Sequence, residues 1–130
     1  MVIEISFKVA ICSKNGKMID EHFGRATKFL IYKIDEDGSY QYIETRDNSP
    51  PSEKLEEHEK MLYNSMKIIS DCKYLLASQI GPAANNKLSL QGIRSFGINM
   101  PIENALKRLG SSRSKNKFLE NIQKPPRVFS

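Results

Sequence analysis

The side chains best suited to chemistry in this 130-residue sequence gather in one short segment, Met18–Ala26. The segment contains two neighbouring carboxylates, Asp20 and Glu21, then one of only two histidines, His22, and finally Arg25. Imidazole is the commonest metal ligand among protein side chains, and an adjacent carboxylate is suited to fix the tautomer of a ligating histidine. The alternative interpretation of His22 is a structural histidine that makes only a hydrogen bond. We take His22 as the first candidate ligand.

The remaining metal-ligating residue types are few. The two cysteines, Cys12 and Cys72, are too few for a disulfide framework and match no zinc-binding spacing. Cys12 is expected at the carboxyl end of a strand, where it would be either a soft thiolate ligand for iron–sulfur or copper chemistry or a small buried hydrophobe. Cys72 is expected at the opposite, amino end of another strand, where packing is its predicted role. Composition alone favours a solvated surface position for His58, which has three glutamates within two residues.

The spacing of apolar residues predicts the elements that must position these side chains. The turn Asp35–Gly38 predicts a hairpin between the second and third strands, because Asp-Gly accommodates positive φ. The apolar run Tyr74–Ile80 predicts a strand parallel to the first. The element order β-β-β-α-β-α-β-α implies an α/β fold, with helices on the faces of a mixed five-stranded sheet. The predicted strands cover residues 3–12, 28–35, 39–46, 74–80 and 93–98, and the predicted helices cover residues 52–70, 82–91 and 101–109, the last stopped by Gly110.

Ligands of open α/β sheets bind beyond the carboxyl ends of the parallel strands. We expect Cys12, Ser13, the loop with His22 and the segment Ser78–Gly81 to meet at this rim. Gly81 precedes a helix that begins with small residues, so its free N–H groups would face an anion, although the glycine and lysine spacing of a P-loop is missing. The sequence has no G-x-S-x-G motif. A two-metal nuclease needs several carboxylates on strand ends, whereas the acids here fall in turns, in the first predicted helix and at Asp20 and Glu21. These observations favour a binding protein over an enzyme.

Length and charge limit the domain organisation. A chain of 130 residues is expected to form one domain. The longest apolar runs are far shorter than a membrane span and the N-terminus lacks a signal-peptide pattern, so we expect a cytoplasmic protein with no membrane partner. Residues 111–130 carry five of the 20 basic residues but one of the 15 acidic residues. We predict a domain over residues 1–110 and a basic, largely disordered tail over 111–130, and this uneven charge makes nucleic acid an improbable partner. An electrostatic docking arm is the alternative role for the tail.

Two blocks of the sequence resemble a known family. The first is Ile19–Ala26, with Lys8–Ile11 before it and Phe29–Tyr32 after it, and the second is Leu75–Pro82. Shorter matches lie at 70–72, 91–93 and 102–106. Over roughly residues 6–109 the chain is similar to the dinitrogenase iron–molybdenum cofactor biosynthesis family, which includes the NifX-like proteins and the C-terminal domain of NifB.

The resemblance implies a ribonuclease H-like fold without nuclease activity. It also implies a protein that carries an iron–sulfur or iron–molybdenum cofactor, or a precursor, as transient cargo for a metallocluster assembly or acceptor protein. Relatives often have a cysteine where this sequence has Ser52, and His58 matches a histidine that follows it. The implied metal ligands are His22, His58 and Cys12, and the implied cofactor-binding residues are His22, Cys12, Arg25, Ser13, Phe23, Gly24 and Gly81.

Two alternatives to a carrier stay open at this point. One is a family member that has lost the cluster and acts as a regulatory, protein-interaction module. Ser52 and the basic tail motivate this alternative. The other is a hydrolase that uses the ribonuclease H-like scaffold.

Overall fold

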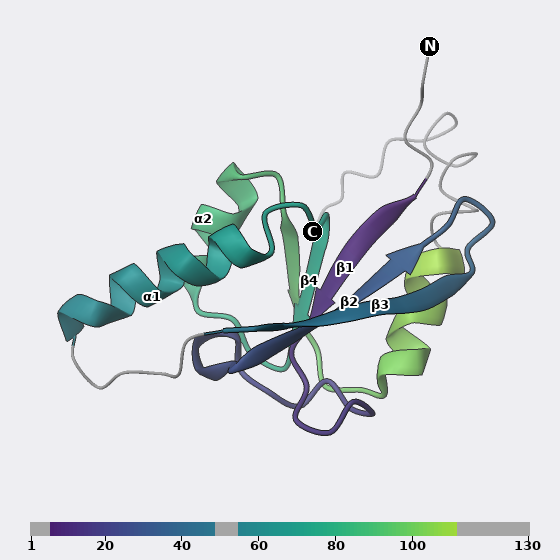
Figure 1. Ribbon diagram of the computed structural model, residues 1–130, viewed down its shortest axis with the longest axis horizontal. Helices are drawn as coiled ribbons and strands as arrows, with labels where there is room; N and C mark the ends of the chain where they lie inside the picture. The colour runs from purple at the N-terminus through teal and green to yellow at the C-terminus, as the bar shows by residue number, and fades with distance from the viewer. Residues whose placement is uncertain (1–5, 49–54, 112–130) are drawn as a thin grey trace, which may run out of the picture.

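A computed structural model describes residues 6–48 and 55–111 of the chain, and Ser52 and the tail beyond residue 111 lie outside the described residues. The middle layer is a single five-stranded sheet with the strand order β3-β2-β1-β4-β5 (Figure 1). Together with the helices, this sheet confirms the predicted α/β class, while the ribonuclease H-like classification stays a prediction. The strands are β1 (Phe7–Ile11), β2 (Lys28–Ile34), β3 (Tyr40–Asp47), β4 (Tyr74–Ala77) and β5 (Arg94–Gly97).

The pairing of the strands is mixed. β2 pairs antiparallel with both β1 and β3, whereas β4 pairs parallel with both β1 and β5. The hairpin between β2 and β3 and the parallel pairing of β4 with β1 are as predicted. Gly38 closes the hairpin turn with a φ of +92°, and its N–H donates to the carbonyl oxygen of Asp35 at 2.9 Å. Val9, Ala10 and Ile11 of the central β1 are all fully buried, since both faces of the sheet are covered there.

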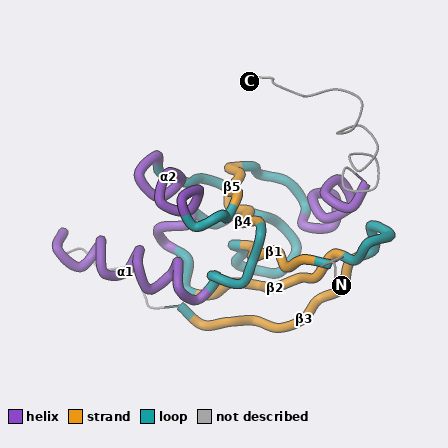
Figure 2. The backbone as a smooth tube through the Cα atoms, turned by 90° about the horizontal axis from the view of Figure 1, so that it is seen from above, coloured by secondary structure: helices purple, strands orange, loops and turns teal. Residues whose placement is uncertain are grey.

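Helices cover both faces of the sheet (Figure 2). α1 (Leu55–Ile68) and α2 (Pro82–Leu90) pack on one face, and a helix over residues 102–111 packs on the other. α2 ends in a Schellman motif, in which Gly92 has a φ of +86° and the N–H of Ile93 donates to the Leu88 carbonyl at 2.9 Å. Among the described residues, no helix combines the length and the apolar character that crossing a bilayer requires.

Gly110 does not stop the last helix, so this prediction is wrong. The helix continues to residue 111, the last described residue. Gly110 instead lies against the hairpin turn, where a Cβ atom on it would overlap the backbone carbonyl of Gly38. Its lack of a side chain therefore serves a contact between the helix and the turn.

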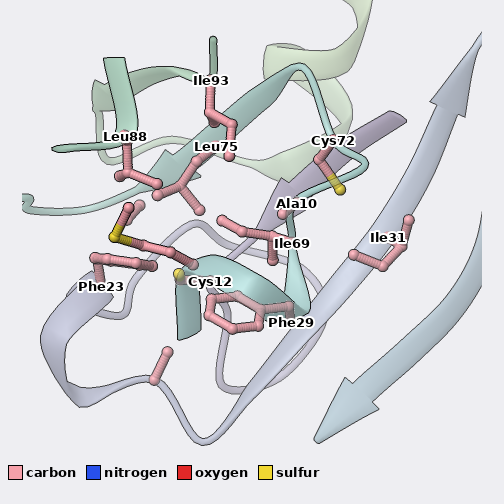
Figure 3. Packing of buried hydrophobic residues seen from close by; sticks show 13 residues of the cluster. Ala10, Cys12, Phe23, Phe29, Ile31, Ile69, Cys72, Leu75, Leu88 and Ile93 are labelled. Atoms are coloured by element: carbon pink, nitrogen blue, oxygen red, sulfur yellow. The ribbon is translucent and has the colours of Figure 1, made fainter. Parts of the chain in front are cut away.

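An apolar cluster is buried on each face of the sheet, between the strands and the helices that cover them. The cluster under the 102–111 helix includes Val9, Ile11 and Leu106, all fully buried. The other cluster lies beneath α1 and α2, and Figure 3 shows it from close by. Its labelled members are Ala10, Cys12, Phe23, Phe29, Ile31, Ile69, Cys72, Leu75, Leu88 and Ile93.

An ion-pair network ties β3 to the C-terminal end of α1. The guanidinium of Arg46 donates to both carboxylate oxygens of Asp71, at 2.7 and 3.0 Å, and to the carbonyl oxygen of Ile68 at 2.8 Å. Glu44 accepts a further hydrogen bond from Arg46 at 3.0 Å, and Lys8 of β1 pairs with Asp71 at 3.1 Å. The network fixes one end of α1 against the sheet.

Candidate functional site

The loop that carries His22 lies at the rim beyond the carboxyl end of β4, where the sequence places it. His22 and Gln79 form a parallel bridge. The N–H of Phe23 donates to the Gln79 carbonyl at 3.0 Å, and the N–H of Ser78 donates to the Glu21 carbonyl at 3.0 Å. The loop therefore continues the sheet as a short extra strand beside residues 78–79.

Buried side chains anchor this loop on both sides of His22. Ile19 is fully buried, and Phe23 is only 2% exposed, with its ring centroid 6.0 Å from that of Phe29. Oδ1 of Asp20, one of the two carboxylates next to His22, accepts the backbone N–H of Lys14 at 2.9 Å. With its apolar residues turned inward, the loop leaves His22, Gly24 and Arg25 exposed.

A cleft of about 790 Å³ separates this loop from α1 and from the start of α2. Both histidines line it, although 35 residues separate them in the sequence. The lining residues are His22, Phe23, Gly24, Arg25 and Ala26 of the loop, Asn48, then His58, Met61, Leu62 and Ser65 of α1, and finally Gln79, Gly81, Pro82, Ala83 and Ala84.

The electrostatics of the cleft favour an anion. Arg25 contributes an exposed cation at the end of the 3₁₀ turn Phe23–Arg25. Gly81 is the N-cap of α2 and offers no side chain to the first-turn N–H groups, and that turn contains no acidic residue. The positive end of the helix dipole is thus directed at the cleft without a counter-charge from its own first turn.

Cys12 does not reach the cleft. Its side chain is fully buried in the apolar cluster, with Phe23 and Phe29 beside it in Figure 3. Burial, and to a smaller degree the charge of Glu21, raises the pKa of the Cys12 thiol far above its ordinary value. The thiolate that metal binding needs is therefore strongly disfavoured. Of the two interpretations of Cys12 from sequence, the structure supports the buried hydrophobe.

Ser13 also lies beneath the loop and not at the cleft. It is fully buried, and its hydroxyl accepts the N–H of Gly16 at 2.9 Å, which closes the turn after β1. Among the side chains that the structure describes, no three of His, Cys, Asp or Glu come together in a way that could hold a metal ion. Any metal group bound in the cleft would therefore have few protein ligands from this part of the chain, His22 and His58 first among them.

The sequence model of the family described as dinitrogenase iron-molybdenum cofactor matches residues 6–112. The chain belongs to this family. It is 38% identical over 76 residues to protein NifY of Klebsiella pneumoniae, a match that covers 58% of this chain and 31% of that protein. It is 26% identical over 116 residues to the FeMo cofactor biosynthesis protein NifB of Chlorobaculum tepidum, covering 88% of this chain and 26% of that protein. The chain thus spans less than a third of the length of these relatives.

Solved structures share the fold. The apo form of the orange protein from Desulfovibrio gigas matches with a TM-score of 0.56 and 19% identity, over 82% of this chain and 88% of that chain. A protein from Methanocaldococcus jannaschii matches with a TM-score of 0.56 and 18% identity, over 85% and 93%. At these identities the likeness concerns the fold alone.

The family resemblance pointed to two segments that line the cleft, the loop with His22 and the segment that ends at Gly81. Other lining residues were not predicted from the sequence. Ser65 follows His58 by seven residues, which is two helical turns, so helical periodicity was a usable signal for it. Met61 and Leu62 lie on the same stripe between them. Nothing in the sequence around Asn48 indicated a role, because its position in the cleft depends on where β3 ends in the folded protein.

Glu21, next to His22 on the loop, has a poorly satisfied side chain. Its backbone carbonyl pairs with Ser78, but one oxygen of its carboxylate is buried without a hydrogen-bond partner among the described residues. Burial is the first cause that raises the pKa of the Glu21 carboxyl above its ordinary value, and the charge of Asp20 raises it further, against the lowering effect of Lys14. Ionisation of Glu21 is therefore less favourable in the folded protein than in the unfolded chain.

Proposed function

We propose that this protein is a non-enzymatic carrier, which binds an iron–sulfur or iron–molybdenum cofactor, or a precursor of one, in the cleft and passes it to an assembly or acceptor protein. Family membership supports a role in cofactor biosynthesis, and the NifB relatives are named as FeMo cofactor biosynthesis proteins. The observation that carries the proposal is the convergence of His22 and His58, from different segments, on one cleft.

The chemistry of the cleft suits such a cargo. Imidazole nitrogen is an accepted ligand of iron, alone or beside sulfur. Arg25 and the first turn of α2 complement the negative charge of a metal–sulfur cluster. Met61 and Leu62 of α1, each half-buried, add an apolar wall.

Few protein ligands also suit a carrier, which must release what it binds. His22 and His58 are both exposed at the cleft, so an acceptor protein can reach a group bound there. The alternative of a cluster-free interaction module depends on Ser52 and the tail, which lie outside the described residues.

The test is retention of cargo under anaerobic conditions. The protein is incubated with ferrous iron and sulfide, or with isolated iron–molybdenum cofactor, and passed through a gel-filtration column before absorption and metal content are measured. We expect the parent protein to retain metal, His22→Ala and His58→Ala to lose most of it, and Cys12→Ala to retain it. Equal retention by the parent and His22→Ala would contradict the proposal.

A matched pair of variants tests the electrostatic part. Arg25→Gln removes the cation at the cleft, and Arg94→Gln removes a cation on β5 that is also exposed but does not line the cleft. We expect only Arg25→Gln to retain less cargo. Retention by this variant should also fall less with rising salt concentration than retention by the parent protein, because the attraction that salt screens has been removed. A similar fall for both variants would show that overall charge, and not the cleft, attracts the cargo.

A further inference from the structure

We infer that Asn48 is a positioning residue of the cleft, which holds the His22 loop and α1 together and so sets the separation of His22 and His58. The inference rests on the proposed function for its purpose, but its geometry stands independently. Asn48 lines the cleft between the two histidine-bearing segments.

Three hydrogen bonds join Asn48 to both sides. Its side-chain amide nitrogen Nδ2 donates to the carbonyl oxygen of Ala26 at 2.8 Å. Its side-chain oxygen Oδ1 accepts the hydroxyl of Ser65 at 3.1 Å. Its backbone N–H donates to the carbonyl of Thr27 at 2.9 Å, which fixes the residue at the end of β3.

The two side-chain partners belong to the segments that carry the histidines. Ala26 closes the turn that follows His22, since its N–H donates to the carbonyl of Phe23 at 3.3 Å, and it is 2% exposed. Ser65 is 6% exposed and lies two helical turns after His58, on the same side of α1. One amide therefore spans the base of the cleft from one histidine-bearing segment to the other.

The chemistry of these partners explains why an amide is needed. The carbonyl of Ala26 can only accept a hydrogen bond, so the side chain opposite it must present a donor there. Aspartate has the same shape as asparagine, but it would set a carboxylate oxygen against that carbonyl. Both groups are part-buried, so the lost bond and the repulsion are poorly compensated by water.

Asn48 contacts α1 at Ser65, in the C-terminal half of the helix, and the continuous helix runs from there to His58. The C-terminal end of α1 is held separately, by the bond from Arg46 to the carbonyl of Ile68. Loss of the bonds made by Asn48 would therefore leave this end of α1 attached to Arg46 but no longer joined to the His22 loop. A cargo bound by both His22 and His58 would then be held less tightly, because the distance between the two histidines would no longer be fixed.

The experiment compares Asn48→Asp and Ser65→Ala with a matched control, Ser95→Ala. The control removes another serine-to-asparagine hydrogen bond, from Ser95 to Asn85, which joins β5 to α2 and involves no residue that lines the cleft. The first readout needs no cargo. The chain has only two histidines, so its ring C–H signals in a ¹H–¹³C NMR spectrum report His22 and His58 directly.

We expect the ring signals of both histidines to shift or broaden in Asn48→Asp and to stay in place in Ser95→Ala. The second readout is retention of a cluster reconstituted from ferrous iron and sulfide. Substitutions of residues that orient metal ligands typically weaken affinity by about 10–100-fold, and we expect a loss in this range for Asn48→Asp and a smaller one for Ser65→Ala.

Two outcomes would overturn the inference. One is a folded Asn48→Asp protein whose histidine signals coincide with those of the parent. The other is an equal loss of cluster in Ser95→Ala, which would assign the effect to general stability. If the parent protein retains no cluster, the proposed function fails, and the ring signals alone decide whether Asn48 positions the histidines.

Discussion

Replacing Arg46 by methionine is expected to lower the free energy of unfolding by about 2–3 kcal/mol, because it removes the network that holds α1 to β3. Methionine keeps much of the apolar stem of arginine, so the change tests the guanidinium more than the packing. The Arg46 side chain is 19% exposed, whereas that of Asp71 is 46% exposed. The ion pair between them is therefore partly screened by water.

The magnitude follows from the bonds that are lost. The screened ion pair between Arg46 and Asp71 contributes about 1 kcal/mol. The side chain of Glu44 is 48% exposed, so its ion pair with Arg46 contributes less than about 0.5 kcal/mol. The bond to the carbonyl of Ile68, from a charged donor at the end of α1, contributes about 1–1.5 kcal/mol. A loss of this size corresponds to a fall in Tm of roughly 10 °C for a domain of about this length.

Urea unfolding followed by circular dichroism measures this loss. The control is Lys107→Met, which breaks the pair between Lys107 and Glu103, both 64% exposed. An exposed pair four residues apart on a helix is worth about 0.3–0.5 kcal/mol, so the control is expected to change little. A loss for Arg46→Met no larger than for Lys107→Met would refute the reasoning.

The same network predicts a pH dependence. Hydrogen bonds from Arg46, and then from Lys8, hold the pKa of the Asp71 carboxyl well below its usual range. A lowered pKa contributes stability above the pKa of the unfolded chain, near about 4, and this stability is lost as the pH falls further. The stability difference between the parent and Asp71→Asn should therefore be constant from pH 7 to about pH 5 and shrink below about pH 4. A difference that stays constant down to pH 2 would contradict the assignment.

Three further predictions concern single residues. Gly110→Ala should lower the free energy of unfolding by about 1–3 kcal/mol, measured by urea unfolding, because the added Cβ would overlap the carbonyl of Gly38. The control is Gly24→Ala, which should cause no such loss because the space around its Cβ is open. Cys12 and Cys72 should react with a thiol reagent such as DTNB only as fast as the protein unfolds, since both are buried and burial raises the pKa of both thiols; complete reaction of the native protein within minutes would contradict their placement. Glu21→Gln should raise Tm at pH 7, because the raised pKa of the Glu21 carboxyl makes its ionisation unfavourable to folding, and this gain should disappear as the pH falls below about 4; thermal melts at pH 7 and pH 4 measure both effects.

The sequence by itself determined the features that depend on neighbours along the chain. Alternating apolar residues marked the strands, the Asp-Gly turn marked the hairpin, and the predicted helix over residues 82–91 matches α2 to within one residue. The rim position of His22 also followed from sequence, because a loop near the carboxyl end of a parallel strand has few other places to lie. These features arise from backbone geometry and side-chain periodicity, which are local.

Only the tertiary structure decided which side chains face the cleft. Strand alternation puts Ala10 and Cys12 on the same face of the sheet, but only the packing of Phe23 over that face shows that the thiol is covered. Local propensity ends a helix at Gly110, yet the contact with Gly38 makes glycine the residue that fits within the helix. The side chain of Asn48 donates to Ala26 and accepts from Ser65, which lie 22 and 17 residues away in the chain. Burial and hydrogen bonding between distant segments depend on how the layers pack, and no short stretch of sequence contains that information.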